Sequence, residues 1–196
     1  MSTEAAPKWS RGWLKQARQT PSPNFGPRPP ATNVTLAVIH SISLPPGEYG
    51  GDEIERFFTN QLDWEAHPYF QEIRGMQVSA HFVIRRDGKL LQFVSVEDRA
   101  WHAGKSSWQG RDNCNDYSVG IELEGLEGQP FEAPQYARLA WLLMALREHY
   151  PIQQVAGHEH IAPGRKNDPG SAFAWQKLQE LTRWHPSIFP SVSVKF

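Results

Sequence analysis

The apolar run VTLAVIH, residues 34–40, is the feature that most constrains the fold of this chain. Aliphatic and β-branched residues follow one another here without polar alternation, which is typical of a strand buried on both faces. Such a strand lies inside a sheet and needs other elements to cover it. His40 closes the run, so we expect the strand to present this histidine at its carboxyl end.

Other segments predict the elements around this strand. Residues 78–96 place apolar stretches on either side of Asp87-Gly88, the dipeptide favoured in type I′ turns, and predict a hairpin. Residues 134–150 have a proline in the first turn and apolar side chains at helical spacing, and predict a helix that packs on the sheet. Shorter signals predict a helix over 52–58, a strand over 118–123 and a second amphipathic helix over 172–184, with connections over 63–70 and 99–118.

Strands mixed with helices indicate an α+β fold, a single domain whose central mixed β-sheet is flanked by α-helices. The length of 196 residues suits one such domain. Residues 1–33 hold six of the 16 prolines and are expected to form an arm, outside the core, that packs on the domain surface through its aromatic residues. Residues 34–184 would form the domain itself, and residues 185–196 a C-terminal tail.

The charge balance excludes several classes of partner. The 20 Lys and Arg residues nearly offset the 21 Asp and Glu residues, which gives no basic surface for nucleic acid or an anionic membrane. A single cysteine, Cys114, forms no internal disulfide and fits a reducing compartment, although a secreted protein that needs no disulfides is also compatible with it. The first residues lack the apolar core of a secretory signal, and the longest apolar run, residues 139–146, is too short to span a bilayer. We expect a cytoplasmic monomer that acts on a small molecule.

The polar stretch GHEHIAPGRKNDPG, residues 157–170, indicates a metal site. Its prolines and glycines disfavour a regular helix, and its His and Asp side chains offer the nitrogen and oxygen ligands that zinc accepts. His158 and Asp168 are ten residues apart, so a loop can turn both toward one point, and His40 is the best distant partner. Three ligands leave one tetrahedral position open, as in catalytic rather than structural zinc sites.

Three other histidines and the cysteine need an interpretation. His81 and His102 are left open between a buried structural role and a hydrogen bond to substrate. His160 is expected beside the metal site or at the surface, with competition for the metal as the alternative. Cys114 is expected to pack rather than to act as a nucleophile.

Five segments of the chain match the motifs of a known family. They are VIHSISLPPGEYGG, SAHFVIRRDGKLLQFV, RAWHAG, CNDYSVGIELEG and GHEHIAPGRKNDPG. In their order and spacing they resemble the AmpD-type anhydro-N-acetylmuramoyl-L-alanine amidases of Gram-negative bacteria, over about residues 10–184. The resemblance implies a mixed sheet with helices packed on it. It also implies hydrolysis of the amide between the lactyl group of anhydro-N-acetylmuramic acid and L-alanine, in cytoplasmic recycling of cell-wall muropeptides, with an effect on β-lactamase induction.

The same resemblance implies roles for single residues. His40, His158 and Asp168 match the ligands of one zinc ion, Glu122 matches the residue that handles the proton of water, and Lys166 matches the residue that faces the developing oxyanion. Strand alternation puts Glu122 and Glu124 on one face, so periodicity does not choose between them. The motif position favours Glu122, and Glu124 is expected at the solvent-accessible strand end.

Substrate contacts are expected from Ser41, His102, Asn113 and Arg165, near the groove that the resemblance implies. Ser41 departs from the usual Asn of the family, and Asn113 stands where a basic residue is common. A non-catalytic muropeptide-binding module is the alternative to an enzyme, and it is disfavoured because the ligand set, Glu122 and Lys166 are all present. A zinc peptidase is disfavoured because the HExxH helix motif is missing.

Overall fold

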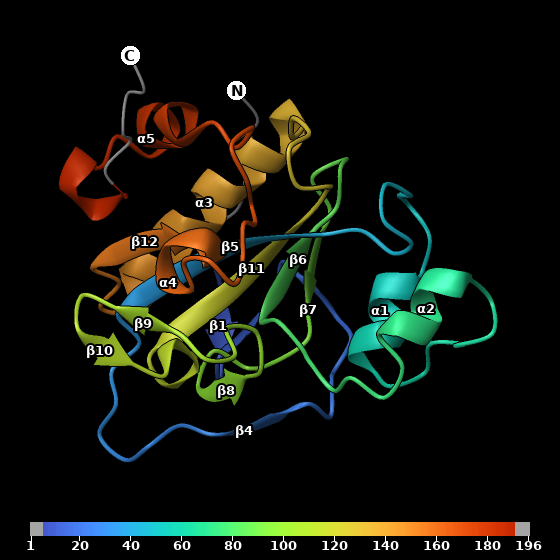
Figure 1. Cartoon of the computed structure of the whole chain (residues 1–196). Coiled ribbons are helices and arrows are strands. Elements are labelled where there is room, and N and C mark those ends of the chain that lie inside the picture. Colours follow the sequence, from blue (N-terminus) through green and yellow to red (C-terminus); the bar gives the residue numbers. More distant parts are fainter. Residues whose placement is uncertain (1–5, 191–196) are drawn as a thin grey trace.

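A computed structural model describes residues 6–190 of the chain. Within this range the main sheet has six strands, in the order β12, β5, β11, β6, β7, β3. Figure 1 shows β12, β5, β11, β6 and β7 side by side. Their bounds are Gln154–Gly157, Leu36–Ile42, Ser118–Glu124, Phe82–Ile84, Leu90–Gln92 and Arg18–Gln19. All neighbouring pairs are parallel except β6 and β7. The predicted α+β domain with a mixed sheet flanked by helices is confirmed.

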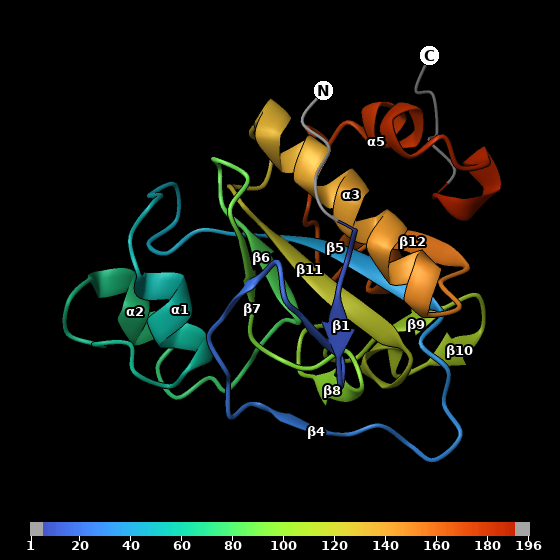
Figure 2. The same ribbon diagram turned by 180° about the vertical axis from the view of Figure 1, so that it is seen from behind.

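One face of the sheet is covered by helix α3, Ala133–His149, and α5, Trp175–Thr182, packs against α3 (Figures 1 and 2). The start of α3 is held by the side chain of Gln135, which accepts a hydrogen bond from the backbone N–H of Glu132 at 3.0 Å. Alternate residues of β5, Ala37 and Ile39, belong to the same buried core as the apolar face of α3. Residues Leu36 and Val38 therefore face the opposite side, and His40 continues that series.

Helices α1, Glu53–Phe58, and α2, Pro68–Glu72, lie together beyond the β6–β7 hairpin (Figure 1). Their apolar side chains form a second core with the outer strands. The sequence predicts α1 correctly but treats residues 63–70 as a connection. Helix α2 begins inside that segment because His67 caps it, its Nδ1 accepting from the N–H of Tyr69 at 3.1 Å, and because a proline fits the first helical position.

The predicted hairpin exists, but its turn differs from the expected type I′. The backbone N–H of Arg85 donates to the carbonyl of Lys89 at 2.9 Å, and that of Gly88 donates to the carbonyl of Arg85 at 2.8 Å. Of the two central residues, Gly88 alone has a positive φ, 84°. The loop therefore has three residues and a left-handed glycine, the arrangement of a type I turn followed by a bulge.

Several short elements were not predicted. The segment 99–118 holds small strands rather than a plain loop, and a one-turn helix begins the polar stretch that was expected to be irregular. Helix α5 is shorter than the predicted 172–184 at both ends, and Arg183, with φ 56°, ends it in the left-handed conformation. These elements are β8 Asp98–Ala100, β9 Ser107–Trp108, β10 Arg111–Asp112, the 3-10 helices Cys114–Asp116 and Pro186–Ile188, and α4 His158–Ile161.

The N-terminal segment is part of the core, which corrects the expectation of an arm outside it. Strands β1, Trp9–Ser10, and β2, Trp13–Leu14, form a hairpin, β3 extends the main sheet, and β4, Phe25–Pro27, pairs with β8. Leu14 is 0% exposed in the main core, and its N–H donates to the buried side chain of Gln92 at 2.8 Å.

Part of the expected C-terminal tail also packs on the domain, since Ile188 and Phe189 are buried in the main core. Residues 1–5 of the predicted arm and 191–196 of the predicted tail lie outside the described residues. Within residues 6–190, none of the helices has the length and apolar character needed to cross a bilayer.

The packing of the N-terminal segment predicts that Leu14→Ala lowers the free energy of unfolding by about 2–5 kcal/mol, because it leaves a cavity in the main core. Lys15→Ala, at an exposed neighbouring position, is the control and should change it by less than about 0.5 kcal/mol. Urea unfolding followed by tryptophan fluorescence measures both. Equal, small effects would show that the segment adds no stability to the core.

Candidate functional site

The pairing of β5 with β11 brings two polar side chains together. The strands run parallel, and His40 lies opposite Glu122 in the register. Their neighbours Ile39 and Ile121 point into the core beneath α3. His40 and Glu122 therefore share the other face of the sheet, on two adjacent inner strands.

The edge strand β12, on the other side of β5, leads to a second histidine. β12 pairs in parallel with β5, Gly157 lies opposite Ile39, and His158 follows directly as the first residue of α4. The loop after α4 then returns, so that the N–H of Glu159 donates to the carbonyl of Asp168 at 2.8 Å. A side chain at Gly157 would meet Pro169 at 2.8 Å, so glycine is required for this close approach.

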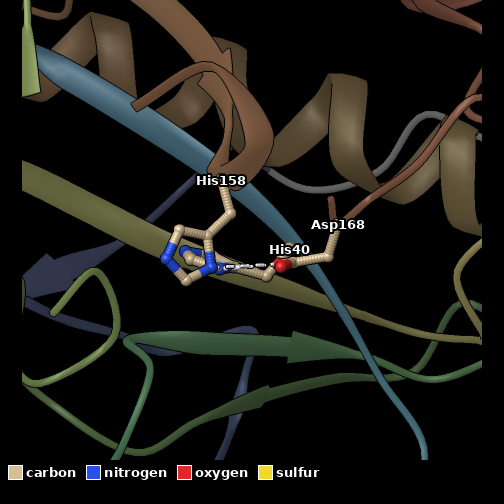
Figure 3. Close-up of side chains that lie close together, drawn as sticks. All are labelled: His40, His158 and Asp168. Atoms are coloured by element: carbon tan, nitrogen blue, oxygen red, sulfur yellow. Dashed lines mark hydrogen bonds and ion pairs between the residues drawn. The ribbon is translucent and has the colours of Figure 1, made fainter. Parts of the chain in front are cut away.

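Three donor atoms from these elements converge on one point (Figure 3). His40 Nδ1 lies 3.0 Å from His158 Nδ1 and 3.1 Å from Asp168 Oδ2, and the His158 and Asp168 atoms are 3.2 Å apart. A tetrahedral zinc ion with bonds of about 2.0–2.1 Å separates its ligand atoms by about 3.3 Å. The observed triangle is close to this size, so the three side chains can hold a metal ion.

The protonation of His40, His158 and Asp168 follows from their surroundings. His158 Nε2 is 3.1 Å from the carbonyl oxygen of Ala103, which only accepts, so Nε2 carries the proton and Nδ1 is free. Burial, together with the neighbouring His158 and Lys166, lowers the pKa of His40 to about 4, and the imidazole is neutral at pH 7. Burial alone would raise the pKa of Asp168, but the adjacent side chains of His158 and His40 lower it below the usual range. Neutral imidazoles and a carboxylate are the forms that bind metals.

Glu122 has a carboxylate oxygen, Oε2, that is buried and has no hydrogen-bond partner among residues 6–190. Burial raises the pKa of Glu122 well above its usual value, the charge of Asp168 adds to this effect, and Lys166 opposes it. A carboxyl group with a raised pKa and a free oxygen is suited to taking up and releasing a proton.

Glu124, two residues along, is fully engaged. It is 2% exposed, and its oxygens accept from Arg85 Nη1 at 2.6 Å and from the backbone N–H groups of Gly50 at 2.8 Å and Arg86 at 3.1 Å. The expectation that Glu124 is accessible to solvent at the strand end is therefore wrong. The loop 49–51 and the hairpin turn cover it, and its role is to pair with a buried arginine.

The donor cluster and Glu122 lie in a cavity of about 470 Å³. Ser41, Arg165 and Lys166 line it on the polar side. The opposite wall is apolar and was not predicted: it comes from α1, α2 and the loops beside them, and includes Tyr69, Met76 and Trp101. Met76, an apolar side chain that is 47% exposed, is a feature that sequence periodicity does not reveal.

The remaining expected substrate contacts are distributed differently. Asn113 is exposed and lines a neighbouring cavity of about 460 Å³, which shares Arg165 with the first one. Arg165 uses Nη2 to bind the carbonyl oxygens of Ala103 and Lys105, both at 2.7 Å. His102 lines the main cavity, but both of its ring nitrogens have protein partners, His40 Nε2 at 2.9 Å and Ser118 Oγ at 3.1 Å.

His81, His160 and Cys114 belong to the supporting structure. His81 is 0% exposed and its Nδ1 accepts from the N–H of Gly120 at 3.0 Å. His160 Nδ1 accepts from the N–H of Gly157 at 3.0 Å, which directs that nitrogen to the backbone. Cys114 is buried, 3.3 Å from the hydroxyl of Tyr117.

The fold and the site together define a single-domain α+β protein that can hold a metal ion at the base of a cavity. Residues 30–171 match the family described as N-acetylmuramoyl-L-alanine amidase (Amidase_2), and the chain belongs to this family.

Named relatives narrow the comparison. The 1,6-anhydro-N-acetylmuramyl-L-alanine amidase AmpD of Citrobacter freundii is 50% identical over 172 residues, which cover 87% of this chain and 92% of that protein. A crystal structure of a selenomethionine derivative of AmpD has a TM-score of 0.87 at 49% identity, and the match covers 89% of this chain and 98% of that one. A complex of the amidase AmiD from E. coli with the substrate anhydro-N-acetylmuramic acid-L-Ala-D-gamma-Glu-L-Lys has a TM-score of 0.57 at 27% identity, covering 91% of this chain and 66% of that one.

The contrast between the two acids predicts opposite effects on stability. Glu124→Gln should lower the free energy of unfolding by about 3 kcal/mol, because it weakens a buried ion pair with Arg85. Glu122→Gln is the matched control. Burial raises the pKa of Glu122 in the folded state. Above the ordinary pKa of glutamate, its ionisation therefore favours the unfolded chain. Glutamine does not ionise, so Glu122→Gln should not lower the free energy of unfolding at pH 7.

Urea unfolding at pH 7, with a chelator present so that metal binding does not contribute, measures both variants. A larger loss for Glu122→Gln than for Glu124→Gln would contradict the assignment of Glu124 as the ion-paired acid.

Proposed function

We propose that this protein hydrolyses the amide bond between the lactyl group of anhydro-N-acetylmuramic acid and L-alanine of cell-wall muropeptides, in peptidoglycan recycling. The observation that carries this proposal is the convergence of His40, His158 and Asp168 in the cavity that also contains the free oxygen of Glu122. The names of the relatives AmpD and AmiD support the substrate class.

We further propose that one zinc ion per chain is the cofactor. The site offers two neutral nitrogens and one carboxylate oxygen, a set that zinc accepts in catalytic sites with an open fourth position. When bound, zinc acidifies water and polarises a carbonyl group. The carbonyl oxygen of Ala103 contacts Nε2 of His158, which leaves Nδ1 of that ring for the metal.

Glu122 and Lys166 would supply the acid–base and electrostatic parts of the reaction. Glu122 takes the proton of the attacking water and passes it to the leaving amine of L-alanine, and its raised pKa favours holding that proton between the two steps. Lys166 lines the same cavity, and its positive charge stabilises the oxyanion that develops on the scissile carbonyl.

A non-catalytic muropeptide-binding module is the alternative. It would need the cavity and the apolar wall, but it gives no reason to keep a carboxylate oxygen of Glu122 buried without a partner, which costs folding free energy. Action in the cytoplasm, the monomeric state, the absence of nucleic-acid and membrane partners, and an effect on β-lactamase induction stay predictions from the sequence and the resemblance.

Mass spectrometry of purified protein incubated with anhydro-muropeptide tests the proposal. We expect two products, free anhydro-N-acetylmuramic acid and a stem peptide that begins with L-alanine. A chelator should abolish turnover and added zinc should restore it, whereas His158→Ala should lose both zinc and activity. Retention of intact substrate on zinc-loaded protein would favour the binding module.

A second experiment separates proton transfer from metal binding. Glu122→Gln should retain a full equivalent of zinc but lower the single-turnover rate by about 10²- to 10⁴-fold, the usual contribution of a positioned acid–base group. Glu124→Gln, assayed at a temperature where it remains folded, should lose far less. Similar losses in the two variants, with zinc content intact, would show that Glu122 is not the proton carrier.

A further inference from the structure

His102 lies directly behind His40, on the side away from the donor cluster. His102 Nδ1 is 2.9 Å from His40 Nε2, and the two rings are nearly perpendicular, with an interplanar angle of 86° and centroids 5.0 Å apart. The other nitrogen of His102, Nε2, is 3.1 Å from Ser118 Oγ. The three side chains form a line of hydrogen bonds that starts at the metal position.

A metal bound at His40 Nδ1 would fix the direction of these hydrogen bonds. His40 can bind a metal through Nδ1 only if that nitrogen has no proton, so Nε2 carries it. His40 Nε2–H then donates to His102 Nδ1, and His102 Nε2–H donates to Ser118 Oγ. The reverse direction would leave His40 Nε2 as an acceptor and put its proton on Nδ1, which would block the metal.

The fold holds the His102 ring in this place by independent contacts. The buried side chain of Asn115 accepts from the backbone N–H groups of His102 at 3.1 Å and Ala103 at 2.8 Å. On β11, a Cβ atom at Gly120 would lie 2.4 Å from the His102 ring, so this strand approaches the ring as closely as glycine alone permits. The ring therefore has little freedom to turn away from His40.

The chemistry of the acceptor also matters. Histidine ligands of metals usually donate their second N–H to a carboxylate, a backbone carbonyl or water. At this site His158 follows that rule through Ala103, but His40 donates to a neutral imidazole. A neutral acceptor orients the ligand without adding negative charge, so that Asp168 remains the anionic member of the donor set.

We infer that His102 is a positioning residue for the metal site: it accepts the Nε2 proton of His40 and so keeps His40 Nδ1 directed at the metal. The inference rests on the proposed function, because it needs a metal at the cluster of His40, His158 and Asp168. His102 then supports a metal ligand, and it does not contact the substrate directly.

Zinc affinity tests this role. Competition with a chromophoric chelator should show that His102→Leu binds zinc about 10- to 100-fold more weakly, the usual effect of removing a partner of a metal ligand. His102→Asn should bind close to the unaltered protein, because its Oδ1 can stand in for Nδ1 as the acceptor. The visible spectrum of the cobalt-substituted protein reports the geometry of the ligands. It should shift in His102→Leu, because His40 can turn without its acceptor, and remain unchanged in His102→Asn.

His81→Leu is the matched control. It also removes a buried imidazole, one with polar contacts to Gly120, Asp98 and Arg28. Its ring centroid lies 5.8 Å from that of His102, but no contact joins His81 to His40 among the described residues. We expect its zinc affinity to stay near that of the unaltered protein. An equal loss of zinc affinity in His81→Leu would overturn the inference, because it would show that any lost buried imidazole disturbs the site. Weak zinc binding by His102→Asn would overturn it as well.

The unaltered protein and His158→Ala separate this inference from the proposed function. If the unaltered protein binds one equivalent of zinc and His158→Ala does not, the metal site is established, and normal affinity in His102→Leu then overturns only the positioning role. If the unaltered protein binds no zinc, the proposed function fails together with the inference.

Discussion

The parallel pairing of β5 with β11 is the constraint on which the rest of the structure depends. Its register places His40 beside Glu122 on one face, while Ile39 and Ile121 are buried beneath α3 on the other. A shift of one residue would move the polar pair into the core and the apolar pair into the cavity. The same burial that stabilises the sheet therefore fixes which face carries the site.

The rest of the site is held by backbone contacts from loops that approach this face. The carbonyl of Ala103 accepts from His158 and from Arg165, so one loop orients a donor of the cluster and anchors the segment that carries Lys166. Gly157 lets the returning loop come close enough to place Asp168. The three donor atoms lie 3.0–3.2 Å apart, and these backbone contacts hold them together.

Residues of one type acquire different roles here because their surroundings differ. Glu122 and Glu124 share a strand and a face, but loop 49–51 and the β6–β7 turn cover Glu124 and give it an arginine partner, while Glu122 opens into the cavity. His158 and His160 are two residues apart on α4, yet the first joins the donor cluster and the second bonds the backbone of Gly157. A buried polar group without a partner costs folding free energy, so the partner that each side chain has, or lacks, decides its role.

The sequence by itself determined the buried strand that ends at His40, the hairpin, the long helix, and the histidines and aspartate that the fold brings together. Apolar periodicity and turn residues report local geometry, and the order of the motifs reports which donors belong to one site. Only the tertiary structure decided that Glu124 is a buried, ion-paired acid and that both ring nitrogens of His102 have protein partners, one of them His40. It also decided that Leu14 of the N-terminal segment enters the core and that the cavity has an apolar wall. Each of these depends on contacts between residues far apart in the chain, and no local pattern encodes which distant group will occupy the other side of a side chain.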